Sequence, residues 1–163
     1  MDAPVLDGIH HIKIPVTDLD RSREWYASRL GYQVEIEFVE KGILMGIGLA
    51  HPSGGPNIAL RLDPQRSAGL GDFDFFSIGV PDTASIEALA ERLTNLGEAH
   101  AGVHFAGIGW ILPALHDPDG HEVRFYTTER HTQISPEQVT QLQDPVETSQ
   151  QREREHARTR TTE

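Results

Sequence analysis

The first half of the chain combines short apolar segments with one amphipathic segment. Ile9–Val16 is rich in β-branched residues, which predicts a strand. Asp18 follows as the N-cap of a predicted helix whose apolar face includes Tyr26 and Leu30. Gly31 comes directly after this face, so we expect the helix to end there.

Three more strands are predicted after this helix. They span Val34–Val39, Ile43–Leu49 and Asn57–Leu62, and a turn-forming cluster at residues 51–56 separates the last two. Apolar and acidic residues alternate strictly in the first of these strands, which predicts that one of its faces lies in water. The Gly-Ile-Gly at 46–48 lacks the strand–turn–helix setting of a phosphate-binding loop, so a bent strand is expected there.

The second half of the chain repeats this order. Phe73–Val80 is its first predicted strand. A helix follows, with apolar residues at spacings of three and four from Ile86 to Leu96, and Gly97 ends it. The remaining predicted strands are Gly102–Ala106, Trp110–His116 and His121–Thr127. The Asp-Pro-Asp-Gly at 117–120 joins the last two strands as a tight turn.

Short motifs mark the two halves as an internal repeat. The paired motifs are Val16-x-Asp18 with Val80-x-Asp82, and Leu30-Gly31 with Leu96-Gly97. Their offsets are 64 and 66 residues. The pattern therefore predicts two tandem β-α-β-β-β units, at about residues 8–66 and 72–127, within one α+β domain at residues 1–129.

The composition separates this domain from a polar C-terminal segment. The chain has 163 residues, of which 37% are hydrophobic, enough for one globular domain. Residues 130–163 are rich in polar residues, and only a short helix after Ser135 is expected there. We expect this C-terminal tail to be solvated or to pack on a partner subunit.

Charge and cysteine content exclude several classes of function. The formal net charge is −11, which repels phosphate backbones and anionic lipid, so nucleic acid and membrane are not expected partners. No apolar run reaches the ~18 residues of a membrane helix, and no signal peptide is visible. The chain has no cysteine, which excludes disulfides and thiolate metal sites and favours a cytoplasmic location.

Two motifs carry a resemblance to a known family. They are His11-x-x-x-x-Val16-x-Asp18-Leu19 and the segment Asp-Pro-Asp-Gly-His-Glu-Val-Arg-Phe at 117–125. Together with the repeated β-α-β-β-β order, they make residues 8–127 resemble the vicinal oxygen chelate superfamily. This superfamily includes glyoxalase I, extradiol dioxygenases and the fosfomycin and bleomycin resistance proteins. The resemblance implies that the two units form a curved mixed sheet around a cup.

The resemblance also implies where a metal ion would bind. The positions that correspond to ligands in the family's metalloenzymes are His11, Leu60, Phe75 and Arg124. Only His11 can donate a lone pair, because leucine and phenylalanine have no donor atom and arginine is a cation without one. A catalytic divalent metal usually takes about three protein ligands. We therefore expect neither a metal nor another cofactor.

Strand alternation and the family register give further candidates for the lining of the cup. The residues expected to bind a ligand are Lys13, Phe75, Trp110, Leu112, Arg124 and Tyr126. Lys13 and Arg124 would receive a carboxylate or phenolate, and the aromatic rings would hold a flat ligand. His11 and Glu122 are the candidates for proton transfer. An internal pair between Glu122 and one of the two cations is the alternative.

Three functions are compatible with these residues. The first is a protein like the bleomycin resistance proteins, which binds a small aromatic or anionic molecule without a metal. The second is a metal-independent enzyme that transfers a proton. The third is a metal-dependent lyase, isomerase or dioxygenase with substituted ligands, so the sequence leaves open whether the protein is an enzyme. We also expect a homodimer, because two-fold dimers are the commonest soluble oligomers.

Overall fold

The computed structural model describes residues 8–131. Its residue contacts divide the chain into two compact units. Among the described residues, the first unit contains residues 8–73 together with His116–His121, and the second contains Asp74–Leu115 and residues 122–131. The turn at 117–120 therefore has its contacts in the first unit, although it joins two strands of the second sheet.

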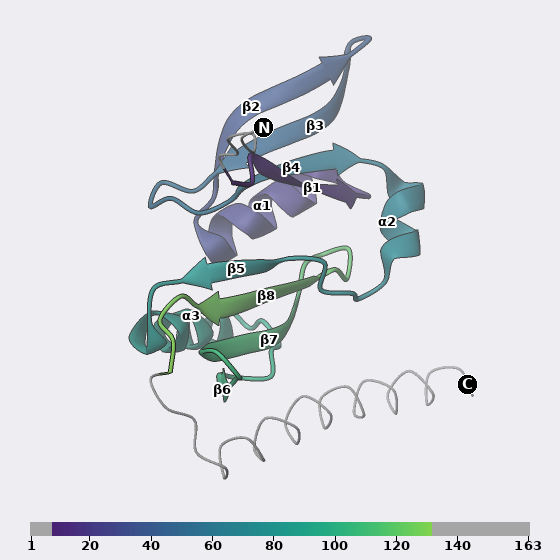
Figure 1. Ribbon diagram of the computed structural model, residues 1–163. Helices are drawn as coiled ribbons and strands as arrows, with labels where there is room; N and C mark the ends of the chain where they lie inside the picture. The colour runs from purple at the N-terminus through teal and green to yellow at the C-terminus, as the bar shows by residue number, and fades with distance from the viewer. Residues whose placement is uncertain (1–7, 132–163) are drawn as a thin grey trace, which may run out of the picture. The chain divides into compact units, whose positions relative to one another are not determined.

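The first unit contains one mixed sheet and two helices (Figure 1). Its elements are β1 (His11–Val16), α1 (Leu19–Leu30), β2 (Gln33–Glu40), β3 (Ile43–Ala50), β4 (Asn57–Leu62) and α2 (Pro64–Leu70). The strand order is β1-β4-β3-β2, with β1 parallel to β4 and the other two pairings antiparallel.

Helix α1 begins and ends where the sequence predicts. The Asp18 side chain accepts a hydrogen bond from the backbone N–H of Arg21, and Gly31 adopts a left-handed φ of 83° after the last turn. The helix covers one face of the sheet, where Tyr26 and Leu60 are almost fully buried. Side chains alternate along a strand, so the residues between the buried ones point to the other face, where Lys13 is exposed; we call it the open face.

The second unit has the same strand arrangement. Its elements are β5 (Ser77–Val80), α3 (Thr83–Asn95), β6 (His104–Phe105), β7 (Trp110–His116) and β8 (Glu122–Thr127). The strand order is β5-β8-β7-β6, with β5 parallel to β8. The two sheets confirm the predicted α+β class and its tandem β-α-β-β-β units.

Several local predictions differ from the structure. Helix α2 was not predicted, although Asp63 caps it and Pro64 occupies its first turn. Strand β5 begins at Ser77 rather than at residue 73. Strand β2 is exposed along its whole length, and its apolar residues Ile36 and Phe38 lie on the open face rather than on the face that α1 covers. The predicted helix after Ser135 lies outside the described residues.

Within residues 8–131, no helix has both the length and the apolar content needed to cross a membrane.

Candidate functional site

The open face of the first sheet is hollow along its middle. The strand registers place its residues in two rows, Lys13–Ala59–Gly48–Ile36 and Pro15–Arg61–Gly46–Phe38. The central strands β4 and β3 occupy the two middle positions of each row, and three of these four residues are small. The outer strands β1 and β2 carry bulkier side chains. We call the resulting hollow, with Gly46, Gly48 and Ala59 as its floor, the trough.

The glycines make room for the side chains that close one side of the trough. A Cβ atom on Gly48 would lie 2.6 Å from Cγ2 of Ile36, and one on Gly46 would lie 3.5 Å from Cδ2 of Phe38. The trough contains a cavity of about 430 Å³. This volume lies in the range of small-molecule sites, and the lining is mostly apolar, as such sites require.

Two of the predicted site residues, His11 and Lys13, line this cavity. Both side chains are exposed. Nδ1 of His11 lies 3.0 Å from Nδ1 of His10, so one imidazole donates a hydrogen bond to the other. Among residues 8–131, none of the ion pairs involves Lys13. Its ammonium group is therefore a cation at the edge of the trough that a ligand can use.

The other cation of the trough, Arg61, is neutralised by Glu40. Nη2 of Arg61 donates a hydrogen bond of 3.1 Å to Oε2 of Glu40, and Nη1 donates to Oε1. The hydrogen bond from Arg61 is also the main cause that lowers the pKa of Glu40. Glu40 therefore remains ionised at neutral pH and keeps Arg61 occupied.

On the second sheet, Arg124 and Tyr126 share the face opposite the buried Phe125, and we call this the open face of that sheet. Arg124 pairs with Ser77, and Tyr126 pairs with Gly79, on the parallel strands β8 and β5. Phe75 lies just before β5 and is half-buried.

Arg124 is held by two carboxylates of its own unit. Nη1 lies 2.6 Å from Oδ2 of Asp74, while Nε and Nη2 donate bonds of 3.0 and 3.1 Å to the two oxygens of Glu122. Glu122 accepts a third bond, of 2.9 Å, from the backbone N–H of Ala114, which has a φ of 61°. Arg124 is thus in the internal pair that the sequence left as an alternative, in a cluster with one net negative charge.

Protein side chains surround the two predicted residues of β7. The Trp110 ring lies 5.5 Å from that of Phe105 and 5.6 Å from that of His131, both edge to face. The His131 ring stacks on Phe105 with centroids 3.8 Å apart. Leu112 is 0% exposed. These residues serve the packing of the second unit in the structure.

The register predicted for Leu60 is wrong. Leu60 pairs with Ile14 and is 1% exposed, so it points toward the helix-covered face and not into the trough with His11. The flanking residues Ala59 and Arg61 occupy the open face instead. The small residues that form the floor of the trough were therefore not identified as site residues, although the Gly-Ile-Gly at 46–48 was a visible signal.

The residues at the family's metal positions offer few donor atoms for a divalent ion. On β4, the open face offers Asn57, Ala59 and an arginine already bound to Glu40, so its one donor for a metal is an uncharged amide oxygen. In the second unit, Phe75 has no donor atom and Arg124 occupies the carboxylate of Glu122. Within the described part of the chain, no group of three or more His, Cys, Asp or Glu side chains could hold a metal.

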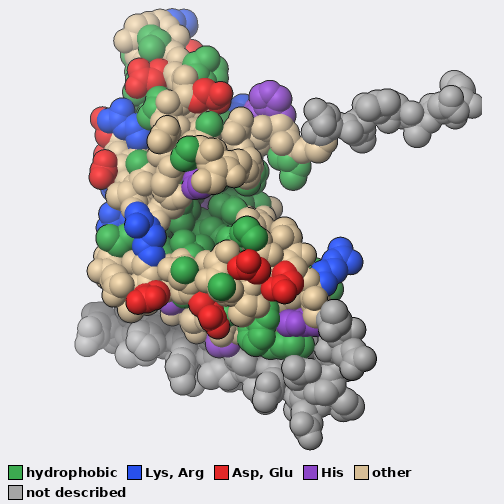
Figure 2. Space-filling view, turned by 90° about the vertical axis from the view of Figure 1, so that its left-hand side faces the viewer, with side chains coloured by type: hydrophobic (Ala, Val, Ile, Leu, Met, Phe, Trp, Pro, Cys, Tyr) green, Lys and Arg blue, Asp and Glu red, His purple; other side chains and the backbone are tan. Residues whose placement is uncertain are grey.

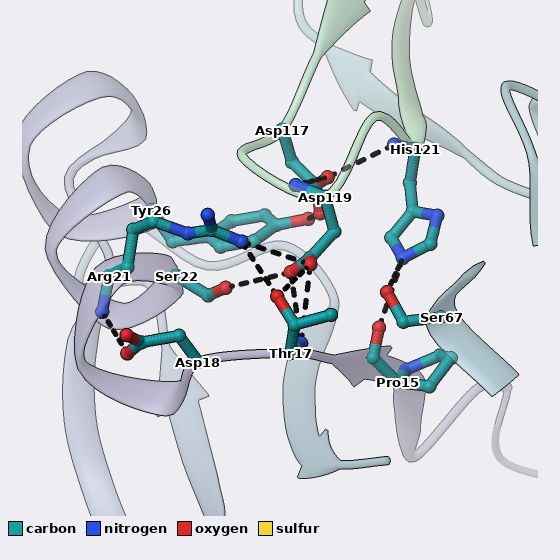
Figure 3. Close-up of polar contacts among 10 residues, drawn as sticks. All are labelled: Pro15, Thr17, Asp18, Arg21, Ser22, Tyr26, Ser67, Asp117, Asp119 and His121. Atoms are coloured by element: carbon teal, nitrogen blue, oxygen red, sulfur yellow. Dashed lines mark hydrogen bonds and ion pairs between the residues drawn. The ribbon is translucent and has the colours of Figure 1, made fainter. Parts of the chain in front are cut away.

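A polar network around the turn at 117–120 was not predicted (Figure 3). Asp119 accepts hydrogen bonds from the backbone N–H of Thr17 at 3.2 Å, from Nη2 of Arg21 at 3.0 Å and from the hydroxyl of Ser22 at 3.3 Å. The Thr17 hydroxyl also bonds this carboxylate. The carboxylate thereby fixes the start of α1.

The turn contributes a second, buried carboxylate. Asp117 accepts a hydrogen bond of 3.2 Å from the hydroxyl of Tyr26 and one of 3.0 Å from the backbone N–H of His121. Burial raises the pKa of Asp117, and burial together with this carboxylate raises the pKa of Tyr26. Nε2 of His121 lies 3.0 Å from the carbonyl oxygen of Pro15. The network is internal and serves the structure of the first unit.

Comparison with known proteins agrees with this architecture. The family model described as Glyoxalase/Bleomycin resistance protein/Dioxygenase superfamily matches residues 8–125. A domain of that description from Frankia sp. EAN1pec is 26% identical, with a TM-score of 0.62 over 76% of this chain and 98% of the other. No curated protein sequence matches the chain.

Two further solved structures share the fold at lower identity. TnmS3, an antibiotic binding protein from Streptomyces sp. CB03234, is 17% identical, with a TM-score of 0.63 over 77% of this chain and 98% of that one. The fosfomycin resistance protein FosX from Listeria monocytogenes is 13% identical, with a TM-score of 0.58 over 82% and 98%.

Proposed function

Because the chain belongs to the glyoxalase/bleomycin resistance protein/dioxygenase superfamily, we propose that it binds a small molecule in the trough, without the metal ion used by the metalloenzymes that it resembles. The observation that best supports this proposal is the trough itself, a mostly apolar cavity of about 430 Å³ with a lysine at its edge. The antibiotic binding protein TnmS3 has the same fold. The absence of cysteine suits the reducing cytoplasm, which we propose as the location.

Two matched variants test where binding occurs. Ala59→Leu places a large side chain on the floor of the trough, whereas Ser77→Leu places the same side chain on the open face of the second sheet. We use 2-naphthoate as the probe, with EDTA-treated protein and isothermal titration calorimetry. Ala59→Leu is expected to weaken binding at least about tenfold, and Ser77→Leu less than about twofold.

Metal content provides an independent check on the same proposal. Protein purified without chelator is expected to contain far less than one equivalent of divalent metal by mass spectrometry. One bound equivalent that is lost in a His11→Ala variant would contradict the proposal, since His11 is the one residue at the family positions that can act as a ligand.

Enzymatic proton transfer is the second candidate function. It is favoured by the position of His11, whose exposed imidazole lines the trough. Glu122 is less suited to this role, because its carboxylate already accepts three N–H groups. Conversion of a bound compound by the wild-type protein, lost in His11→Gln with binding retained, would establish this function.

We also propose that the protein forms a homodimer through the hairpin of β2 and β3. Val39 and Ile43 are each 60% exposed, and Ile36 and Phe38 are about half exposed. Figure 2 shows hydrophobic side chains next to acidic ones in the upper part of the view, where Figure 1 places this hairpin. Val39→Glu is expected to shift the mass in sedimentation equilibrium from dimer to monomer, and a monomeric wild-type protein would contradict the proposal.

A further inference from the structure

A second cavity adjoins the trough in the first unit. Its volume is about 630 Å³, and residues of α2 and of the segment before it form part of its wall. Lys13 and Arg61 line both cavities. They lie on neighbouring strands, since Lys13 pairs with Ala59, two residues before Arg61 on the same face. The two cavities therefore meet at these two cations.

The charges around this junction leave one cation uncompensated. Arg66 lines the second cavity, but its Nη1 lies 2.6 Å from Oδ2 of Asp63. Arg61 is bound to Glu40 in the same way. Lys13 takes part in none of the ion pairs among the described residues. Lys13 thus provides, at this junction, a cation that no carboxylate of residues 8–131 pairs with, in a chain of net charge −11.

We infer that the ligand of the trough is an aromatic monoanion whose anionic group binds Lys13 at this junction. The inference rests on the proposed function and adds the chemical class of the ligand. The flat ring lies over the floor of Gly46, Gly48 and Ala59, beside Phe38. A carboxylate or phenolate then extends toward the ammonium group, which supplies a charge-assisted hydrogen bond.

The sequence suggested that Lys13 and Arg124 both bind the anion, whereas the inferred site uses Lys13 alone. Arg124 is enclosed by Asp74 and Glu122, so its cluster carries one net negative charge and repels an anion. Glu35 also lines the trough, on strand β2 at the other edge of the sheet from Lys13. A second anionic group on the ligand would meet that carboxylate, which is why the proposed ligand carries a single negative charge.

The two lysines of the chain provide the test. Lys13→Met removes the cation at the junction, and Lys41→Met removes the same charge from the exposed turn between β2 and β3. The probes are 2-naphthoate and the neutral 2-naphthylmethanol, titrated by calorimetry at low ionic strength. Lys13→Met is expected to weaken 2-naphthoate about tenfold and to leave 2-naphthylmethanol unchanged. Lys41→Met is expected to change neither affinity, and Lys13→Arg to retain 2-naphthoate.

The outcomes separate this inference from the proposed function. Equal affinity of Lys13→Met and wild type for 2-naphthoate, with binding lost in Ala59→Leu, would overturn the inference and leave the proposed function intact. Failure of wild-type protein to bind either probe would overturn both. Unchanged thermal unfolding of Lys13→Met excludes a general loss of structure as the cause of weaker binding.

Discussion

The two sheets have the same strand order, but their open faces use charge in opposite ways. The face of the first sheet has small residues in its middle, and Lys13 at its edge has no ion pair among residues 8–131. The face of the second sheet places Arg124 between Asp74 and Glu122. One face therefore retains a cavity and an available cation, and the other satisfies its cation internally. A repeated fold thus does not imply a repeated site.

The largest expected effect comes from breaking the ion pair of the second face. Arg124→Ala leaves Glu122 and Asp74, which are only 12% and 26% exposed, as carboxylates without their cation. We expect the free energy of unfolding in urea to fall by about 2–4 kcal/mol. The affinity of the folded protein for 2-naphthoate should change little, because Arg124 does not bind the ligand in this account.

An exposed ion pair provides the control for that variant. Arg66→Ala also removes an arginine from a carboxylate, but the Arg66 side chain is 80% exposed, so a loss below about 0.5 kcal/mol is expected. If Arg124→Ala is as stable as wild type yet loses 2-naphthoate binding, Arg124 has the ligand role that the sequence suggested.

A smaller effect is expected from the pH dependence of the first unit. Because burial raises the pKa of Asp117, the folded protein retains a proton that the unfolded chain releases just above pH 3.8. The stabilisation from Asp117 is present below pH 3.8 and is lost as pH rises through the folded-state pKa. The unfolding free energy of wild type minus that of Asp117→Asn should therefore decrease as pH rises from about 4 to 6.

Comparison with the Asn variant is necessary because other carboxylates titrate in the opposite direction. Hydrogen bonds lower the pKa values of Asp63 and Asp82 in the folded protein, so their stabilisation is lost as pH falls. Subtracting the unfolding free energy of the Asp117→Asn variant from that of the wild type removes these contributions. If this difference in unfolding free energy stays constant or grows between about pH 4 and 6, the account of Asp117 as a buried carboxylate in the network of the turn is contradicted.

Local signals were sufficient to predict most of the fold. Helix α1 lies between Asp18 and Gly31 because the cap residues act within a few positions of the chain. Helix α2 was missed because its seven residues are too few to show an apolar period. Strand β2 shows the predicted alternation, but no element among residues 8–131 buries its apolar face, and alternation alone does not reveal that.

The site was less predictable, because it depends on register. The residue pairs Ile14–Leu60 and Ile78–Phe125 are equivalent in the two sheets, which gives repeat offsets of 64 for the first strands and 65 for the last. A single offset of 64 therefore placed Leu60 on the wrong face, since one residue reverses the direction of a side chain. The ion pair of Arg124 with Asp74 links distant positions, and no local pattern indicates it.

The most direct test of the proposed site is to locate the ligand by ¹H–¹⁵N correlation spectra during titration with 2-naphthoate in EDTA. Glycine amides mark the two faces: Gly46 and Gly48 lie in the floor of the trough, and Gly79 lies on the open face of the second sheet. We expect Gly46 and Gly48 to shift progressively with ligand concentration while Gly79 stays in place. Shifts at Gly79 with unchanged Gly46 and Gly48, or binding that appears only after a divalent metal is added, would contradict a metal-free site in the trough.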